Sequence, residues 1–409
     1  MQHQWQWSIV TDLQDIPSES QHALVQQSDT NTPFLSVAFL KLLAQSHSVD
    51  GDTGWQSHHI LVTQTSTESS IEKPELSQDI VALLPCYLKS HSYGEYVFDH
   101  AWASAYHQHQ LAYYPKLLCA VPFTPVTGSR ALIHRKHAEL GVTEQHIFDY
   151  VGTIKEQLTE RADASSLHVL FLPRNISDAL LSQNMHQRLS IQFVWYNQEY
   201  SSMDDFMQAL TSRKRRSIRK ERAPFAAKDA NDNGVSIKTL SNDALSQDVV
   251  DAFYLCYQQT YYKRSGHAGY LSGAFFDQLL NTMKDNICIV AAFRDQRMIA
   301  GSLFFYNDTA LFGRYWGALE DVSGLHFECC YYRGIEFAIA KGIQVFNPGT
   351  QGEHKILRGF RPTFCYSNHY LVEPAFDRAV ADFVIRERAG IKQYHAETTQ
   401  LLPFKQEDS

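Results

Sequence analysis

The chain has 409 residues, of which 44% are hydrophobic. This length allows a sizeable core and predicts two domains or one large one. The formal net charge of −8 argues against a general affinity for nucleic acids or membrane surfaces. No run approaches the roughly 18 apolar residues of a membrane span, and the N-terminus lacks the pattern of a signal peptide. We therefore expect a soluble cytoplasmic protein.

The cysteines and histidines point to no disulfide framework and no metal. Seven cysteines are scattered without a C-x-x-C pair, so we expect them to be reduced and mostly buried. Nineteen histidines are present, but none has metal-ligand spacing with a convincing third ligand. The sequence predicts no metal site.

In chain order, two stretches share one plan. Each reads as three successive strands with short turns, the first over 58–62, 79–88 and 94–99 and the second over 287–293, 298–306 and 311–317. In the first stretch the turn over 64–77 is long and polar, which predicts a surface insertion. A helix and a strand follow each stretch, at 101–110 and 116–121 and at 327–341 and 343–346.

The segment between these stretches alternates helices and strands. Helices are predicted over 143–162, 177–187, 204–227, 243–264 and 272–284, and strands over 167–172 and 191–196. Internal similarity at this length indicates duplicated domains in an α/β (α+β) fold, with mixed sheets flanked by helices. A strong turn at 231–234 places the boundary. We divide the chain into an N-terminal segment 1–30, domains 31–230 and 231–395, and a tail 396–409.

Reactive side chains concentrate in the loop 347–358, directly after a predicted strand. Ligand sites of α/β sheets form beyond the carboxyl ends of strands, and Gly349 allows backbone to approach a ligand closely. Glu353 and His354 can move protons, whereas Lys355 and Arg358 can hold an anion. The alternative is an ordinary turn with a solvated charged face.

A second feature is a basic helix. Seven basic residues lie within 212–222, in an otherwise acidic protein. At helical spacing Arg215 and Arg219 share one face, and Arg216 lies on another. Such a density favours an anionic partner, either RNA or a nucleotide-linked substrate. The alternative is a solvated helix whose charges pair with acids elsewhere.

Several long strings resemble a known family. They are Tyr87–Asp99 (YLKSHSYGEYVFD), Tyr114–Leu118 (YPKLL), Val121–Gly128 (VPFTPVTG), Gly313–Gly317 (GRYWG), His326–Glu328 (HFE) and Gly349–Lys355 (GTQGEHK). The chain resembles the FemAB-like "peptidoglycan biosynthesis/recognition" family of the GNAT acyltransferase superfamily over 34–371. The resemblance implies tandem GNAT-like domains and transfer of an acyl group to nitrogen. In the similar FemX-type enzymes, an aminoacyl group moves from tRNA to an amine of a cell-wall precursor.

The acyl donor that the resemblance implies is acyl-CoA or aminoacyl-tRNA, and the acceptor is a small-molecule or peptide amine. GNAT enzymes hold the coenzyme A diphosphate in a glycine-rich loop before a helix. The equivalent stretch here is 314–321, where Leu319 replaces a small residue and two acids, Glu320 and Asp321, follow. Negative charge disfavours a diphosphate, so coenzyme A binding in the usual mode is not expected.

For the reaction we expect Glu353 or His354 to take the amine proton and Tyr315 to supply a proton to the leaving group. Lys355 or Arg358 would hold an anionic group of the substrate. The other candidate binding residues are Gly349, Gln351, Arg314, Lys116, Thr124, Thr127, Glu95 and Asp99, with Arg215, Arg216 and Arg219 as an anion site. Two alternatives remain: a structural salt bridge of Glu353–His354 to Arg358 or Lys355, and a non-catalytic recognition protein on the same scaffold.

Overall fold

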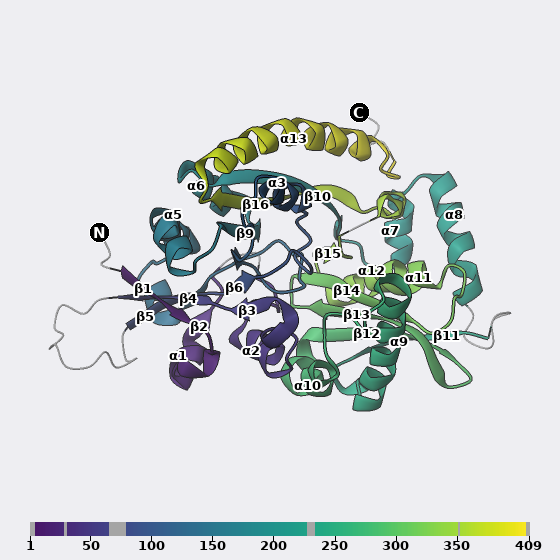
Figure 1. Ribbon diagram of the computed structural model, residues 1–409. Coiled ribbons are helices and arrows are strands. Elements are labelled where there is room, and N and C mark those ends of the chain that lie inside the picture. The colour runs from purple at the N-terminus through teal and green to yellow at the C-terminus, as the bar shows by residue number, and fades with distance from the viewer. Residues whose placement is uncertain (1–4, 28–30, 65–78, 227–233, 351, 406–409) are drawn as a thin grey trace. The chain divides into compact units, whose positions relative to one another are not determined.

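The computed structural model describes residues 5–27, 31–64, 79–226, 234–350 and 352–405 (Figure 1). Contacts divide the chain into two compact units. Unit 1 comprises Met1–Ser190 and Cys365–Ile391, and unit 2 comprises Ile191–Phe364 and Lys392–Ser409. The basic helix belongs to unit 2. The predicted boundary at 231–234 and the predicted insertion at 64–77 lie almost wholly outside the described residues.

Unit 1 contains two groups of strands. The first is an antiparallel sheet in the order β1 (Trp5–Val10), β4 (His59–Gln64), β5 (Asp79–Leu84), β8 (Leu132–His134) and β2 (Leu24–Val25). The second has the order β3 (Trp55–Ser57), β6 (Cys86–Lys89), β7 (Lys116–Cys119), β9 (Ser166–Leu172) and β16 (Arg361–Leu371). In this second group β7 and β9 are parallel, and the other pairs are antiparallel.

The helices of unit 1 are mostly short. They are α1 (Ser18–Ala23), α2 (Val37–Gln45), α3 (His100–Gln108), α4 (Arg135–Glu139), α5 (Glu144–Arg161) and α6 (Arg174–Ser182), with single turns η1 (Leu13–Asp15) and η2 (Gly51–Thr53). The long helix α5 starts at a capping box between Thr143 and His146. Its apolar face, including Ile147 and Val151, is fully buried in the core of the unit.

One predicted strand of unit 1 is wrong. Residues 94–99 form a loop between β6 and α3. Tyr96 has φ +62°, and the side chains of Glu95 and Asp99 both turn inward to Lys116. In a strand, residues 95 and 99 would also lie on the same face. The left-handed conformation of Tyr96, however, interrupts the extended backbone that a strand requires.

Unit 2 is built on six strands in the order β11 (Ser236–Ser241), β12 (Ile287–Arg294), β13 (Arg297–Tyr306), β14 (Ala310–Ala318), β15 (Val345–Asn347) and β10 (His186–Tyr196). In the described part of this sheet β14 and β15 pair in parallel, and the other neighbouring strands pair antiparallel. The meander predicted for the second copy is therefore confirmed. The predicted α/β class, with mixed sheets flanked by helices, is confirmed as well.

The helices of unit 2 are α7 (Met203–Ala209), α8 (Ser212–Arg222), α9 (Gln247–Ser265), α10 (Gly273–Met283), α11 (Leu325–Phe327), the π-helix η6 (Glu328–Tyr332) and α12 (Arg333–Lys341). Single turns are η3 (Ala223–Phe225), η4 (Asn242–Ala244) and η5 (Lys284–Asn286), and η7 (Glu353–Arg358) is a longer 3₁₀ segment. The last helix, α13, spans Pro374–Gln400. Among the described residues no helix has the length and apolar character that a membrane crossing requires.

Helices cover both faces of the unit 2 sheet. Neighbouring residues of β13 point to opposite faces: a Cβ at Gly301 would contact Phe253 of α9, whereas Ser302 contacts Cys330 of η6. At Gly317 of β14 a Cβ would lie 2.6 Å from the carbonyl oxygen of Cys256, so α9 packs directly on the strand. This close approach requires glycine at position 317.

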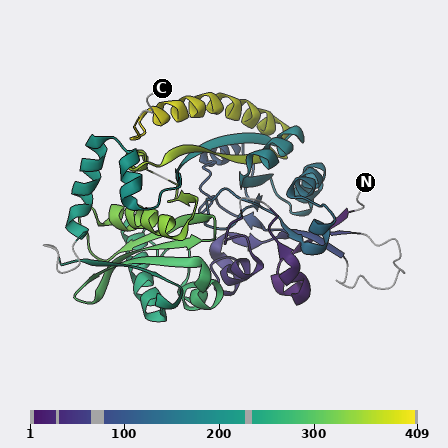
Figure 2. The ribbon, with the colours of Figure 1, turned by 180° about the vertical axis from the view of Figure 1, so that it is seen from behind.

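The long helix predicted over 204–227 is wrong, because the chain turns between α7 and α8. Leu210 is extended, with ψ 159°, and pairs with Phe404 in an isolated bridge. Arg215 reaches back from α8 and donates to the carbonyl of Leu210 at 2.7 Å. Seen from behind, α8 is an outer helix of unit 2 (Figure 2).

Candidate functional site

The sheet of unit 2 opens between β14 and β15. The parallel pairing ends at Phe312 and Asn347, and β14 carries a bulge at Arg314, where its register against β13 shifts. β-Bulges are over-represented next to active sites. A pocket of about 90 Å³ lies at this opening. Its walls include Gly313, Arg314 and Pro348.

The π-helix η6 supplies another wall of the pocket. Cys330 and Tyr331 both line it, together with Ser302 and His326. The Cys330 thiol lies 2.8 Å from the Ser302 hydroxyl, and burial raises the pKa of Cys330 to about 12. The thiol is therefore protonated at neutral pH. Short π-helical turns occur frequently at functional sites.

Hydrogen bonds hold the loop after β15 in one conformation. The Asn347 side chain donates to Gln192 and accepts from the backbone N–H of Gly349, at 2.8 and 2.9 Å. The Lys355 ammonium is buried and donates to the carbonyl of Gly349 at 2.6 Å. Burial lowers the pKa of Lys355 to about 7. Gln351 lies outside the described residues.

His354 is directed toward the pocket wall. Its Nε2 lies 2.8 Å from the hydroxyl of Tyr331, which itself lines the pocket. The ring also covers Gly352: a Cβ there would fall 2.7 Å from His354 Nδ1, and Gly352 has φ +114°. Partial burial and the neighbouring cations Arg358 and Lys355 lower the pKa of His354. The imidazole is thus a neutral proton acceptor at pH 7.

Arg358 links the segment 352–358 to helix α8. It donates to the carbonyl of His354 at 2.8 Å and to Glu221 of α8 at 2.7 Å. Its guanidinium lies 3.7 Å from the ring centroid of Phe327. Glu221 also accepts from Tyr332. The role of Glu221 could not be read from its position inside a run of basic residues.

Of the other residues predicted for this site, two line the pocket and one lies at the surface. Tyr315 and Arg314 line the pocket, and burial raises the pKa of Tyr315. Glu353 is exposed, and its carboxylate accepts from Tyr394 of α13 at 2.7 Å. The structure thus brings Tyr315 and Arg314 to one pocket, places His354 behind Tyr331 of the pocket wall, and turns Glu353 to the surface.

The stretch 314–321 does not fit a diphosphate. Residues up to Ala318 belong to β14, and the backbone N–H groups of Leu319 and Glu320 both donate to the carbonyl of Ile299. Glu320 pairs with Arg294, and Asp321 with Lys263. Two of the backbone donors that would hold a coenzyme A diphosphate therefore already bind Ile299, and two carboxylates lie beside them.

The basic helix α8 has a structural face and an open face. On the structural face, Arg222 pairs with Glu328 and Glu336, and Arg215 caps the end of α7. Arg216 and Arg219 are exposed, as are Arg213 and Lys220. No ion pair is recorded for these four side chains among the described residues. They form a cationic stripe at i, i+3, i+6 and i+7.

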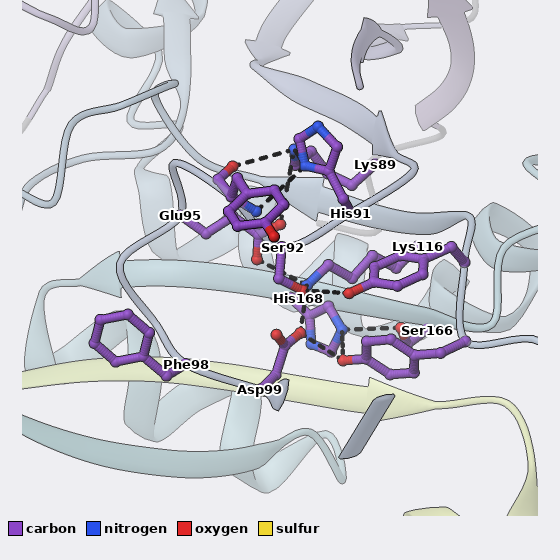
Figure 3. Close-up of polar contacts among 12 residues, drawn as sticks. Lys89, His91, Ser92, Glu95, Phe98, Asp99, Lys116, Ser166 and His168 are labelled. Atoms are coloured by element: carbon purple, nitrogen blue, oxygen red, sulfur yellow. Dashed lines mark hydrogen bonds and ion pairs between the residues drawn. The ribbon is translucent and has the colours of Figure 1, made fainter. Parts of the chain in front are cut away.

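A separate group of buried charges lies in unit 1 (Figure 3). Lys116 donates to Glu95 and Ser92, at 2.8 and 2.9 Å, and to Asp99. Both carboxylates approach Lys116 from the loop 90–99, whereas Phe98 of that loop points away (Figure 3). Burial raises the pKa of Asp99, but the Lys116 ammonium outweighs burial and lowers it overall. Three of the predicted residues therefore form one cluster.

The cluster includes residues that sequence reasoning missed. Lys89 lies 3.9 Å from Glu95 and 4.0 Å from the ring centroid of Trp55. Burial lowers the pKa of Lys89 and raises that of Glu95, each to about 7. His168 lies 3.3 Å from the hydroxyl of Tyr113, which donates to Asp99. The only sequence signal was the density of polar residues in 89–99.

Thr124 and Thr127 lie in the turn after β7. The Thr124 hydroxyl donates to the carbonyl of Pro122 at 2.9 Å, and its side chain is buried. Phe123 has φ +56° and packs against Gly94 of the cluster loop. No metal-binding group of three or more His, Cys, Asp or Glu side chains occurs in the part of the chain that the structure describes.

The model of the "peptidoglycan biosynthesis/recognition" family, FemAB-like, matches residues 12–406. The chain belongs to the FemAB-like family. No curated protein matches it.

Several solved structures are similar in fold to this FemAB-like chain. One is FemX, at 8% identity and a TM-score of 0.49, covering 92% of this chain and 100% of FemX. Another is a tandem GNAT protein from the clavulanic acid biosynthesis pathway, at 10% identity and 0.43, covering 90% and 99%. L-PGS from Bacillus licheniformis matches at 8% identity and 0.43, covering 88% and 99%.

Proposed function

We propose that this FemAB-like protein is an N-acyltransferase that moves an acyl or aminoacyl group to an amine in the unit 2 pocket. The observation that carries the proposal is the hydrogen bond between Tyr331 and His354, at the wall of a pocket opened by the β14 bulge. Acyl transfer to an amine requires a group that removes a proton from the attacking nitrogen. This pair provides one at the pocket wall.

The proton leaves the amine through Tyr331. As the nitrogen attacks the carbonyl carbon, Tyr331 accepts the amine proton and passes its own proton to His354 Nε2. The pKa of Tyr331 is raised by burial, so the two transfers occur together and no tyrosinate accumulates. His354 therefore acts through Tyr331.

The remaining steps use Tyr315, which lines the same pocket from β14. The bond between the carbonyl carbon and the leaving oxygen or sulfur breaks, and Tyr315 protonates the leaving group. Tyr315 then regains a proton, and His354 releases one, so that one proton moves overall from the amine to the leaving group. Arg314 is positioned to hold an anionic part of the substrate. Lys355 and Arg358 keep the loop and the His354 ring in place through the carbonyls of Gly349 and His354.

We propose aminoacyl-tRNA, in preference to acyl-CoA, as the donor. The N–H groups of Leu319 and Glu320 are used by Ile299, which argues against a coenzyme A diphosphate at this loop. The exposed stripe of α8 suits a polyanion. Through Glu221, the same helix contacts Arg358, which holds His354. An RNA bound to α8 would thus be connected, through Glu221 and Arg358, to the segment that carries the proton acceptor His354.

We propose that the buried cluster of unit 1 fixes the loop 90–99 as a substrate-binding segment within that unit. Keeping two carboxylates and two lysines inside a protein is costly, and strongly shifted pKa values such as those of Lys89 and Glu95 cluster at functional sites. Glu95, Asp99 and Lys116 come from the family motifs and meet in one place. Thr124 and Thr127 belong to the turn that packs on the cluster loop through Phe123.

Mass spectrometry of reaction products tests the proposal. The protein is incubated with a nucleotide-linked muropeptide as acceptor and with either aminoacyl-tRNA or acetyl-CoA as donor. We expect an amide product with aminoacyl-tRNA and none with acetyl-CoA. A product from acetyl-CoA alone would overturn the donor assignment. Binding of the muropeptide without an amide from either donor would favour a non-catalytic recognition protein.

A further inference from the structure

A second pocket lies in unit 1, and none of the residues proposed above to take part in acyl transfer lines it. Its volume is about 310 Å³, which is at the lower end of the range for small-molecule sites. The walls come from η1, the C-terminal half of α2, the turn after it, and strands β3 and β4. The residues used below are Asp12, Lys41, His47, Asp50, Ser57 and His59.

Two residues of this pocket have strained backbones. Asp50 has φ +67° and ψ −177°, a region that is normally restricted to glycine, and His47 has φ +53°. Non-glycine residues in such conformations cluster at ligand sites, where the side chain is needed in a fixed place. The N–H of Asp50 donates to Trp55 at 2.7 Å, which holds the strained turn closed.

The strain fixes a carboxylate at the pocket. Asp50 accepts the backbone N–H of Ser57 at 2.6 Å on one oxygen and the Ser57 hydroxyl at 3.0 Å on the other. Each carboxylate oxygen has two lone pairs, so both keep capacity for a ligand donor. Asp12 contributes a second, exposed carboxylate to the pocket lining, where one of its oxygens also accepts the backbone N–H of Gln14 at 2.8 Å.

Donors face the same space. His59 is buried, and its Nδ1 accepts the backbone N–H of Cys86 at 3.3 Å. The proton of this imidazole is therefore on Nε2, which has no hydrogen-bond partner within the described ranges. Burial lowers the pKa of His59 to about 4, so the ring stays neutral. Lys41, whose ammonium donates to the neutral Gln21 amide at 3.3 Å and has no acidic partner in the described part of the chain, adds a positive charge.

We propose that this pocket binds a zwitterionic α-amino acid or dipeptide. The ligand's carboxylate is held by Lys41 and the Nε2–H of His59, and its ammonium by Asp50 and Asp12. A ligand with a single charge would leave one half of this donor and acceptor set unpaired. The site does not depend on acyl transfer, and its test does not involve turnover.

Isothermal titration calorimetry on the full chain tests the proposal with three probes. These are L-alanyl-L-alanine, its N-acetylated form and its C-terminal amide. We expect the dipeptide to bind and each capped form to bind about tenfold more weakly or worse, since each loses a charge-assisted hydrogen bond. Absence of dipeptide binding at about 10 mM, or equal binding of the capped forms, would overturn the proposal.

Variants locate the site. Asp50→Asn keeps the shape and an acceptor for Ser57, and Lys41→Met removes a half-buried ammonium. Each is expected to weaken dipeptide binding about tenfold. Asp52→Asn, an exposed neighbour outside the pocket, is the matched control and should bind as the wild type does. Wild-type affinity in both Asp50→Asn and Lys41→Met would place the ligand elsewhere. Because Lys41→Met leaves the strained turn intact, the test holds even if Asp50→Asn does not fold.

Discussion

At the scale of single residues, the segment Gly352–Lys355 sends three adjacent side chains to three environments. Glu353 faces solvent and Tyr394, His354 faces the pocket wall, and Lys355 is buried beneath Gly349. The positive φ of Gly352 starts this divergence. From the sequence these residues form one cluster of reactive groups, and only the backbone conformation separates their roles.

Gly352→Ala tests the position of His354. A Cβ would collide with the His354 ring, and alanine is also strained at φ +114°. We expect amide formation to fall at least tenfold while the fold is kept, measured by product mass spectrometry and circular dichroism. Gly342→Ala is the control, because Gly342 has φ +69° and open space around it. An unchanged rate in Gly352→Ala would mean that the ring position is unimportant.

Lys355 predicts a pH dependence of stability. Its folded pKa of about 7 lies below the value of an unfolded lysine, so the unfolded chain binds more protons between these two values. Stability contributed by this residue therefore rises with pH above 7 and levels off near pH 10. Urea denaturation at pH 7 and pH 9 measures how much the free energy of unfolding increases with pH. This increase should be about 1–2 kcal/mol smaller in Lys355→Met than in the wild type. Equal gains in both proteins would contradict the lowered pKa.

At the scale of elements, apolar runs predicted strands well and polar runs poorly. The meander β12–β14 follows from its apolar alternation and short turns, and it is correct. The stretch 94–99 was read as a strand, but buried ion pairs and a left-handed Tyr96 make it a loop. Tyr331 was missed because a helical pattern does not reveal a π-helical turn. Contacts between distant segments, such as that of Glu221 with Arg358, leave no local pattern.

The buried cluster of unit 1 predicts a large stability effect. Asp99→Asn removes a carboxylate from the buried Lys116 ammonium and leaves that charge poorly compensated. We expect a loss of about 3–5 kcal/mol in the free energy of unfolding, measured by urea denaturation. Glu160→Gln, at an exposed helix position, should change it by less than about 0.5 kcal/mol. Equal stability of Asp99→Asn and the wild type would show that the ion pair is dispensable.

The α8 stripe predicts a salt-dependent affinity for RNA. Changing Arg216 and Arg219 together to glutamate should weaken tRNA binding and reduce the slope of log K against log salt by about 1.5 or more. Fluorescence anisotropy at several salt concentrations measures both quantities. Changing Arg135 and Arg174 of unit 1, both exposed, together to glutamate alters the net charge equally and is the control. An unaltered slope in the α8 variant would exclude this stripe as the RNA contact.

At the scale of the whole molecule, the family and the fold class followed from long motifs and from the repeated strand plan. The candidate chemistry did not follow as directly. The bulge at Arg314 and the early end of the β14–β15 pairing create the pocket, and neither is visible as a sequence pattern. The sequence therefore could not tell which of the predicted acids and bases lie at the pocket. Only the backbone conformation shows this.

The central claim is that His354, acting through Tyr331, accepts the amine proton during acyl transfer. Single-turnover rates of amide formation test it most directly, with Glu353→Gln as the matched control from the adjacent, exposed position. The account predicts that His354→Ala and Tyr331→Phe each lose roughly 10²–10⁴-fold in rate, whereas Glu353→Gln stays near the wild type. Wild-type rates in His354→Ala, or a comparable loss in Glu353→Gln alone, would contradict it.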